Sequence, residues 1–396
     1  MKYSILHQKN MFYTLITYCY YKYKKGKENK ILKITDITTK IYKWDLPQPI
    51  TNGLHTYSTV SLNIIEIHTD EGITGIGLTG GVKDGEKIVK EIIEYFKTKL
   101  IGLNPLNNEM IWELLWEPKI VGRRGITTRI IGGIDLALLD FKAKLSNIPA
   151  HKLLGGYTES VRAYIAGGYY EDGKGLKELG MEMEENLKLG ATAVKMKIGG
   201  ISINEDVERV KTVREAVGDK IDIMVDANCA YNLNQAIKIA DKIEKYDIFW
   251  FEEPLLPDDY DGYKILSSKS SIPIATGENE YTKFGFKELI EKNGATIIQP
   301  DALIMGGATE FMKVASFAET HHLEIAPHGN QNVHIQLLCA IPNGLILEYY
   351  VGTTDPLWGQ IYQNDLKLKN GMVSPPDVPG LGLEIKEKNL EKYRVI

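Results

Sequence analysis

From residue 156 to about residue 355, short apolar runs alternate with helical patterns, which indicates a repeated strand–helix unit. We expect strands at residues 161–166, 193–198, 221–225, 248–251, 273–276, 296–299, 323–326 and 345–348. Helical periodicity predicts helices between several of these runs, at residues 203–217, 233–246, 308–320 and 333–340. Eight short strands in this rhythm favour a (β/α) barrel over an open doubly wound sheet.

A different pattern precedes the repeats. Residues 31–42, 59–68 and 73–78 predict strands, and the turn Asp70-Glu71-Gly72 joins the last two as a hairpin. Residues 47–57 predict a mobile loop between the first two strands.

Helices should follow this meander, since amphipathic patterns cover residues 86–100, 107–116 and 127–145. We therefore expect a small α+β domain over residues 31–155, beside a barrel over residues 156–355. Residues 356–396 carry turn signals, and we expect them to return to the first domain.

Composition excludes several classes of protein. The 396 residues suffice for a barrel and a second domain, and the net charge of −5 argues against a nucleic-acid surface. No apolar run reaches the ~18–20 residues that a membrane span needs. The cysteines at positions 19, 229 and 339 are widely scattered, which predicts a reducing, cytoplasmic location without a disulfide framework.

Residues 1–30 differ from the rest, because they contain seven lysines and one glutamate. We interpret them as a disordered or peripheral tail and assign them no chemistry.

Three carboxylates follow predicted strands at even spacing. Asp226, Glu252 and Glu278 lie 26 residues apart, close to the length of one strand–helix unit of a barrel, which averages about 31 residues. Three neighbouring strands would then bring three acids to one rim. Such acids repel each other unless a hard cation lies between them, so the spacing predicts a Mg²⁺ site.

The other predicted strands also end in polar or charged residues. Seven consecutive strand ends share this property, which a purely structural explanation does not account for. Besides the three acids, they supply Lys195, Lys197, Asn228, Asp301, His328 and Glu348.

These residue types suit removal of a proton next to a carboxylate. Lys197 can act as the base if neighbouring cations, such as Lys195, and partial burial lower its pKa. Asp301 and His328 end consecutive strands, so we expect a hydrogen-bonded dyad that could act as base or as acid. Glu348, kept protonated by its neighbours, would donate a hydrogen bond to the developing oxyanion.

Several alternatives stay open at this point. A lone barrel lysine could form a Schiff base instead. Asn228, His55 and Thr56 are candidates for recognising substrate hydroxyl groups, although a solvated or structural role is more common for such residues. Glu253 follows Glu252, and strand alternation favours Glu252 as the inward-pointing ligand.

The motifs together resemble the enolase superfamily in its mandelate racemase subgroup. The resemblance extends from about residue 31 to the C-terminus. It rests on Lys195-Met196-Lys197, Val225-Asp226-Ala227-Asn228, Trp250-Phe251-Glu252-Glu253-Pro254, Thr276-Gly277-Glu278-Asn279, Gln299-Pro300-Asp301 and Ala326-Pro327-His328-Gly329.

The resemblance implies a modified (β/α)₇β barrel under an N-terminal α+β capping domain that the C-terminal segment completes. It also implies Mg²⁺ on Asp226, Glu252 and Glu278, a Lys197 base and an Asp301–His328 dyad. The muconate-cycloisomerase-like subgroup is disfavoured, because it places a lysine at the end of the sixth strand.

We therefore expect a cytoplasmic, homo-oligomeric, Mg²⁺-dependent dehydratase of an acid sugar, an aldonate or aldarate. It would remove the C2 proton and eliminate the 3-hydroxyl to give a 2-keto-3-deoxy acid. A racemase or epimerase of a 2-hydroxy acid is the runner-up, and an inactive binding or structural homologue is the alternative from another class.

Overall fold

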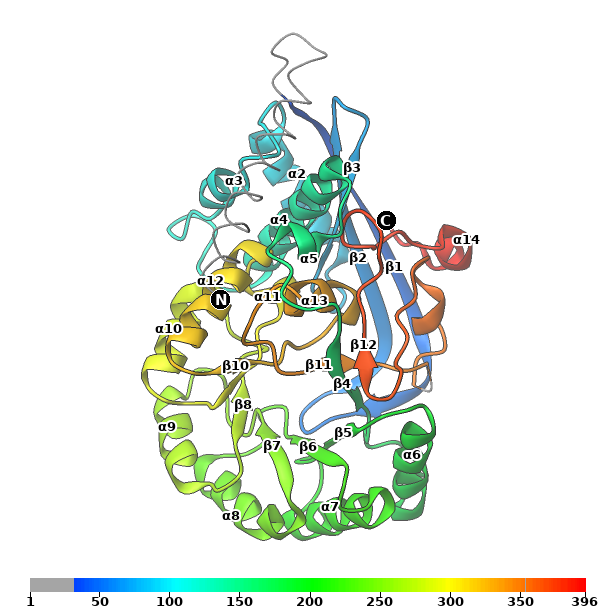
Figure 1. The fold of residues 1–396 in the computed structure, drawn as a ribbon, viewed down its shortest axis with the longest axis vertical. Coiled ribbons are helices and arrows are strands. Elements are labelled where there is room, and N and C mark those ends of the chain that lie inside the picture. Colours follow the sequence, from blue (N-terminus) through cyan, green and yellow to red (C-terminus); the bar gives the residue numbers. More distant parts are fainter. Residues whose placement is uncertain (1–31, 353) are drawn as a thin grey trace, which may run out of the picture.

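The computed structural model describes residues 32–352 and 354–396, so the predicted tail over residues 1–30 lies outside the described residues. A sheet with flanking helices occupies one end of the molecule, and strand–helix repeats form the other (Figure 1). The first part contains β1 (Ile34–Thr51), β2 (Thr56–Thr69), β3 (Thr74–Thr79), α2 (Glu86–Leu100), α3 (Asn108–Leu115), α4 (Ile126–Ser146) and α5 (Ala150–Leu153). Its three strands are antiparallel in the order β1-β2-β3.

Eight parallel strands form a closed barrel. They are β4 (Val161–Ala166), β5 (Ala193–Lys197), β6 (Asp222–Asp226), β7 (Ile248–Glu252), β8 (Ile274–Thr276), β9 (Ile297–Ile298), β10 (Glu324–Ile325) and β11 (Leu347–Tyr349). Neighbours pair in sequence order from β10 back to β4, and β11 pairs with β4. The Leu345 amide donates to the Ile325 carbonyl at 2.8 Å, beside the bridge from Ile325 to Gly344, so the ring closes between β10 and β11.

Helices connect consecutive barrel strands, and no helix follows β11 directly within the described residues. The connecting helices are α6 (Leu176–Lys188), α7 (Ile203–Val217), α8 (Leu233–Ile243) with η1 (Glu244–Tyr246), α9 (Tyr260–Lys269), α10 (Thr282–Glu291), α11 (Ala302–Met305), α12 (Ala308–Thr320) and α13 (Gln331–Leu338). The predicted (β/α)₇β barrel is thus confirmed. No helix of the described residues is long and apolar enough to span a membrane.

Local sequence explains where two of the barrel helices begin. At α7, the Ser202 side chain accepts from the Glu205 amide, while the Glu205 carboxylate accepts from the Ser202 amide. Asn232 and Gln235 form the same reciprocal pair at α8. Such capping boxes satisfy the free amides of the first helical turn and so fix where each strand-end loop stops.

The C-terminal segment packs against both parts. It contains η2 (Trp358–Gln360), β12 (Met372–Val373), α14 (Glu387–Leu390) and η3 (Glu391–Tyr393). The short strand β12 pairs antiparallel with β4 of the barrel. The Val395 amide then donates to the Ile41 carbonyl of β1 at 2.8 Å, so the chain does return to the first sheet as expected.

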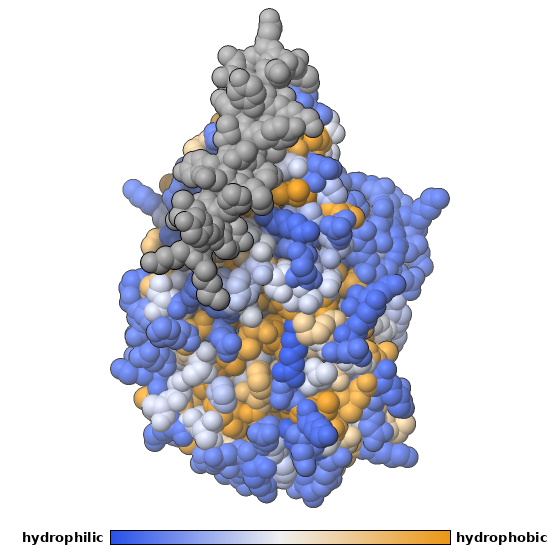
Figure 2. Space-filling view, in the orientation of Figure 1, coloured by the Kyte–Doolittle hydropathy of each residue, from blue (hydrophilic) through white to orange (hydrophobic). Residues whose placement is uncertain are grey.

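Side-chain alternation along the strands separates two cores. Met224 and Trp250 belong to the apolar cluster inside the barrel, whereas Val225 and Phe251 belong to the larger cluster between the strands and the helices. The next inward position on each strand is therefore the last one, where the charged residues stand. The outer helices are mostly hydrophilic on the face in Figure 2, and hydrophobic residues gather over the strands.

The prediction of a loop over residues 47–57 was wrong. The strand β1 continues to Thr51 and β2 begins at Thr56, so the two strands form a long ribbon with a short tip. The amides of Thr51 and Tyr170 each donate to the other's carbonyl at 2.9 Å, which joins the ribbon to the loop after β4. At Gly53 an added Cβ would lie 2.2 Å from the Ala227 carbonyl oxygen, so the tip rests directly on barrel backbone.

A side chain at position 53 should therefore lift the ribbon tip from the barrel. In Gly53→Ala we expect amide hydrogen exchange of residues 51–57 to accelerate at least about 10-fold, because the contact that protects it is lost. Gly359→Ala is the matched control, since an added Cβ meets nothing within 4 Å there. Unchanged exchange in Gly53→Ala would show that the tip is not seated as described.

Two buried carboxylates of α4 join this helix to the barrel, to β3 and to the C-terminal segment. Asp135 accepts from the Thr309 amide at 2.8 Å and from its hydroxyl at 2.6 Å, in the first turn of α12. Asp140 accepts from the Leu381 amide at 2.6 Å and the Ile76 amide at 2.8 Å. Burial raises the pKa of Asp135 from 3.8 to about 6, against these hydrogen bonds.

This raised pKa makes stability depend on pH. As pH rises from about 4, the unfolded chain loses the Asp135 proton before the folded chain does, so the folded state loses up to about 3 kcal/mol until pH passes the folded-state value. The Tm of the wild type minus that of Asp135→Asn should therefore fall between about pH 4.5 and about pH 7. A constant or rising difference would contradict the assignment.

Candidate active site

Three buried carboxylates meet at the C-terminal ends of neighbouring strands. Asp226 ends β6, Glu252 ends β7, and Glu278 follows β8. One carboxylate oxygen from each lies within 4.8 Å of the others, and all three side chains are buried. Glu278 Oε2 is buried without a hydrogen-bond partner among the described residues. Hard oxygen donors with an unsatisfied atom are the ligands that Mg²⁺ prefers, so the three residues fit that cation.

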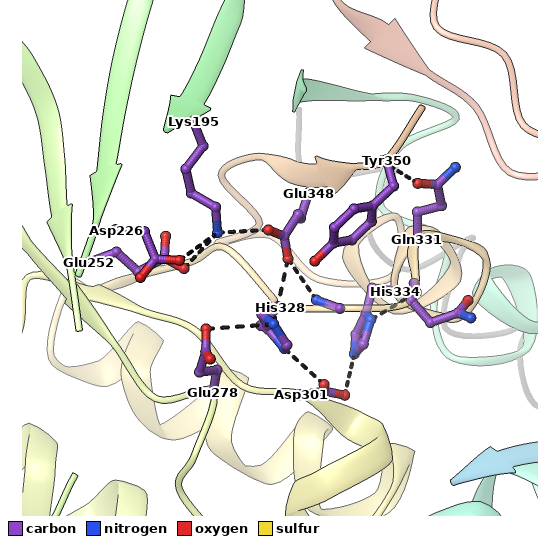
Figure 3. A network of polar contacts seen from close by, with 12 residues as sticks. Lys195, Asp226, Glu252, Glu278, Asp301, His328, Gln331, His334, Glu348 and Tyr350 are labelled. Carbon is purple, nitrogen blue, oxygen red and sulfur yellow. Dashed lines mark hydrogen bonds and ion pairs between the residues drawn. The ribbon is translucent and has the colours of Figure 1, made fainter. Parts of the chain in front are cut away.

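The two lysines of β5 enter this group from one side. Strand register places Lys197 opposite Asp226, and Asp226 opposite Glu252. Lys195 Nζ lies 2.6 Å from Glu252 Oε1, 2.7 Å from Glu348 Oε1 and 3.6 Å from Asp226 Oδ2 (Figure 3). Lys197 Nζ donates to Asp226 Oδ2. The lysines therefore neutralise part of the acidic charge.

We expected the surroundings of Lys197 to lower its pKa. This was wrong, because the net effect of the surrounding side chains is to raise it. Burial is the largest effect and lowers it, and so does Lys195, but Asp226, Tyr169 and Glu252 all raise it, and the net pKa lies above its ordinary value. The predicted influences are present, but the ion pair with Asp226 is the largest of the effects that oppose them. A free amine at Lys197 thus requires that another partner takes over the Asp226 charge.

The predicted dyad is present on the other side of the barrel mouth. His328 Nδ1 lies 3.0 Å from Asp301 Oδ2, while Nε2 lies 3.6 Å from Glu278 Oε2 and 4.0 Å from Glu348 Oε2 (Figure 3). Burial lowers the pKa of His328. Glu278, the Asp301 hydrogen bond and Glu348 raise it by more than burial lowers it, so the pKa is about 10. The imidazolium form is therefore favoured at neutral pH.

The surroundings of Glu348 favour its ionised form, so the expectation of a protonated side chain was wrong. Burial raises its pKa, but Lys195 and His328 override burial and lower the pKa to about 2. The Gly329 amide also donates to Glu348 Oε2 at 2.8 Å. Glu348 therefore accepts hydrogen bonds and holds Lys195 and the loop of His328 in place.

The residues considered for substrate recognition are divided between two places. Asn228 lies beside the acids, where its backbone amide donates to Asp226 Oδ1 at 2.9 Å. The Oδ1 atom of its side chain is buried and has no partner among the described residues. His55 and Thr56 are exposed at the ribbon tip. There the Thr56 hydroxyl lies 2.9 Å from that of Thr51, and the His55 ring lies 6.4 Å from the ring of Tyr57.

Two tyrosines near the site escaped the sequence reasoning. The Tyr169 ring lies 5.2 Å from Lys197 Nζ, a cation–π distance. Tyr57 lies at the ribbon tip, and burial is the chief cause of its raised pKa. The charge of Lys197 lowers that pKa and the charge of Glu278 raises it, so Tyr57 lies near both residues. Tyr169 follows the predicted first strand by three residues, and this position at a strand end was the available signal.

The sequence matches two family models that together cover most of the chain. Residues 34–155 match the mandelate racemase / muconate lactonizing enzyme N-terminal domain. Residues 178–389 match the enolase C-terminal domain-like family.

Curated relatives and a solved structure agree with these matches. Arabinonate dehydratase of Saccharolobus solfataricus is 35% identical over 83% of this chain and 89% of its own length. D-galactarolactone cycloisomerase of Agrobacterium fabrum is 32% identical over 92% of this chain and 99% of its own. The structure of L-talarate/galactarate dehydratase from Salmonella typhimurium LT2, liganded with Mg and L-lyxarohydroxamate, has a TM-score of 0.87, with 29% identity over 94% of this chain and 96% of that one.

The fold and the matches define an enzyme of the enolase superfamily. Within it, the chain belongs to the mandelate racemase / muconate lactonizing enzyme family, as the motifs indicated. Its cofactor is Mg²⁺, which the buried acidic group fits.

If the three acids bind the cation, Glu278→Gln should lower Mg²⁺ affinity at least about 10-fold, since one charged ligand is lost. Isothermal titration measures this directly. Glu253→Gln is the matched control, because Glu253 is equally buried but accepts from Asn279 Nδ2 at 2.8 Å and lies outside the group. Equal losses in both variants would assign the effect to buried charge in general.

Proposed function

We propose that this chain is a Mg²⁺-dependent dehydratase of an acid sugar, an aldonate or aldarate, that yields a 2-keto-3-deoxy acid. The observation that carries the proposal is the placement of a candidate base and a candidate acid on opposing sides of one carboxylate group. The strands of Lys197 and His328 are separated by β4 and β11 on one side of the ring and by four strands on the other.

Lys197 removes the C2 proton in this proposal. The substrate carboxylate would lie at the three acids, beside the positive charge of Lys195. Asp226, Glu252 and Glu278 would hold Mg²⁺, which would supply positive charge to stabilise the second negative charge that the substrate gains when the C2 proton leaves. Lys197 accepts the proton as the free amine, the form that loss of its ion pair with Asp226 favours.

His328 acts as the acid. Its Nε2 faces the carboxylates of Glu278 and Glu348, while its Nδ1 is bonded to Asp301. The Asp301 hydrogen bond and the charge of Glu348, neither of them from a proposed Mg²⁺ ligand, both raise the pKa of His328 and favour a proton on Nε2. That proton passes to the 3-hydroxyl, which leaves as water, and the enol product tautomerises to the 2-keto acid. Asp301 stabilises the imidazolium before the transfer and fixes the ring orientation.

The relatives support the class of substrate, because arabinonate dehydratase acts on an acid sugar by its name. Cycloisomerisation of a sugar-acid lactone is a second candidate, which the cycloisomerase relative favours. Racemisation or epimerisation would use the same two residues, with His328 returning a proton to C2 instead of to a hydroxyl.

The test is a screen of mono- and diacid sugars and their lactones for 2-keto acid formation. Activity should appear with an aldonate or aldarate and vanish with EDTA. Inversion at C2 without keto acid would establish the racemase, and lactone turnover alone the cycloisomerase. Borohydride trapping of a lysine would favour the Schiff-base alternative. If no compound in the library is turned over, the chain is better explained as an inactive binding or structural homologue.

Variants separate the two roles. Lys197→Ala should lower both C2–deuterium exchange and dehydration about 10²–10⁴-fold, the usual contribution of a general base. His328→Ala should lower dehydration similarly but retain C2 exchange, since the acid acts after the C2 proton has left. Lys211→Ala and His322→Ala are matched controls, because the half-exposed Lys211 and the exposed His322 lie away from the site. Full exchange in Lys197→Ala would refute the base.

A further inference from the structure

A second buried histidine, His334, lies next to Asp301 of the dyad. His334 lies in the first turn of α13 and has no exposed surface. Its Nε2 lies 3.0 Å from the amide nitrogen of Ala302, and its Nδ1 lies 2.9 Å from the carbonyl oxygen of Asn330. Figure 3 shows the ring pointing toward Asp301, on the side opposite His328.

These two partners fix the protonation state of His334. An amide N–H can only donate, so Nε2 must present its lone pair, and a carbonyl can only accept, so Nδ1 must carry the hydrogen. A neutral imidazole satisfies both contacts, and a protonated one would place two hydrogens between Nε2 and the Ala302 nitrogen. Burial lowers the pKa of His334, which acts in the same direction.

The contacts of His334 join the two loops that carry the dyad. Ala302 directly follows Asp301, and Asn330 lies two residues after His328. The Ala302 contact spans 32 residues of sequence and joins α13 to the first residue of α11, whereas the Asn330 contact stays within the start of one helix. The Nε2 contact is therefore the one that connects the two separate elements next to Asp301 and His328.

Neutrality also leaves the Asp301 charge available to His328. His334 Nε2 lies 3.5 Å from Asp301 Oδ1, but with Ala302 as its donor it makes no ion pair there. That oxygen accepts from the Leu303 amide at 2.8 Å instead, and the other oxygen faces His328. A cation at position 334 would compete with His328 for the same carboxylate.

We propose that His334 is a positioning residue that keeps Asp301 within hydrogen-bond distance of His328 through its Nε2 contact with Ala302. Only the kinetic part of the test rests on the proposed function. The competing explanation is that His334 merely fills space, since its ring packs 6.2 Å from that of Phe311.

Three substitutions separate these explanations. His334→Gln keeps an acceptor near the place of Nε2, His334→Asn keeps a donor near the place of Nδ1, and His334→Phe keeps only the ring. His151→Phe is the matched control, because His151 is equally buried and contacts α13 through Gln336 but lies away from the dyad.

The first readout is the crystal structure of each variant with Mg²⁺. We expect the distance from His328 Nδ1 to Asp301 Oδ2 to exceed about 3.5 Å in His334→Asn and His334→Phe, past the hydrogen-bond range. It should stay near 3.0 Å in His334→Gln and His151→Phe, as in the wild type.

The second readout is kinetic. In His334→Asn and His334→Phe the kcat for dehydration should fall about 10–100-fold, as for other residues that orient a reacting group, while C2 exchange by Lys197 and KM change less than about twofold. His334→Gln should recover to within about fivefold of the wild type.

Two results would overturn the proposal. One is an unchanged dyad distance in His334→Asn. The other is an equal loss of C2 exchange and dehydration that follows the loss of Tm, which assigns His334 to packing. If the wild type exchanges no C2 proton with any acid sugar, the proposed function fails, and the crystal structures still decide the role of His334. If His334→Phe does not fold, the Gln and Asn variants decide alone.

Discussion

Mutual neutralisation of buried charges holds the mouth of this barrel together. Lys195 Nζ lies between Glu252 Oε1 at 2.6 Å and Glu348 Oε1 at 2.7 Å, and all three side chains are almost fully buried. An isolated ion buried this deeply costs several kcal/mol, whereas a closely paired one regains most of that. The charged residues therefore depend on each other, and the strands that carry them must stay in register.

The barrel supplies that register. Adjacent parallel strands place Lys197, Asp226 and Glu252 directly opposite one another, and alternation turns all three inward. The apolar interior below them, with Met224 and Trp250, excludes water and strengthens each electrostatic contact. Trp250 also donates from Nε1 to Glu252 Oε2 at 2.9 Å, so the packing below fixes the acid above.

Sequence predicted the parts of this arrangement that depend on periodicity. The strand ends, the even spacing of the three acids and the dyad follow from local patterns, because each charged residue lies within three residues of the end of its strand. The ionisation states did not follow. Whether Lys197 is governed by Lys195 or by Asp226, and whether Glu348 keeps its proton, depends on distances of a few ångströms between strands far apart in sequence. His334 was missed for the same reason, since its partner at Ala302 lies on another loop.

The ribbon tip shows how such an enzyme can change while its chemistry stays constant. The tip is attached through backbone groups, by the paired amides and carbonyls of Thr51 and Tyr170 and by the bare Cα of Gly53 against a barrel carbonyl. The side chains of Leu54, His55 and Thr56 take no part in that attachment and are exposed. Substitutions at these positions can therefore accumulate one at a time without disturbing how the tip is mounted or the charged residues at the barrel mouth.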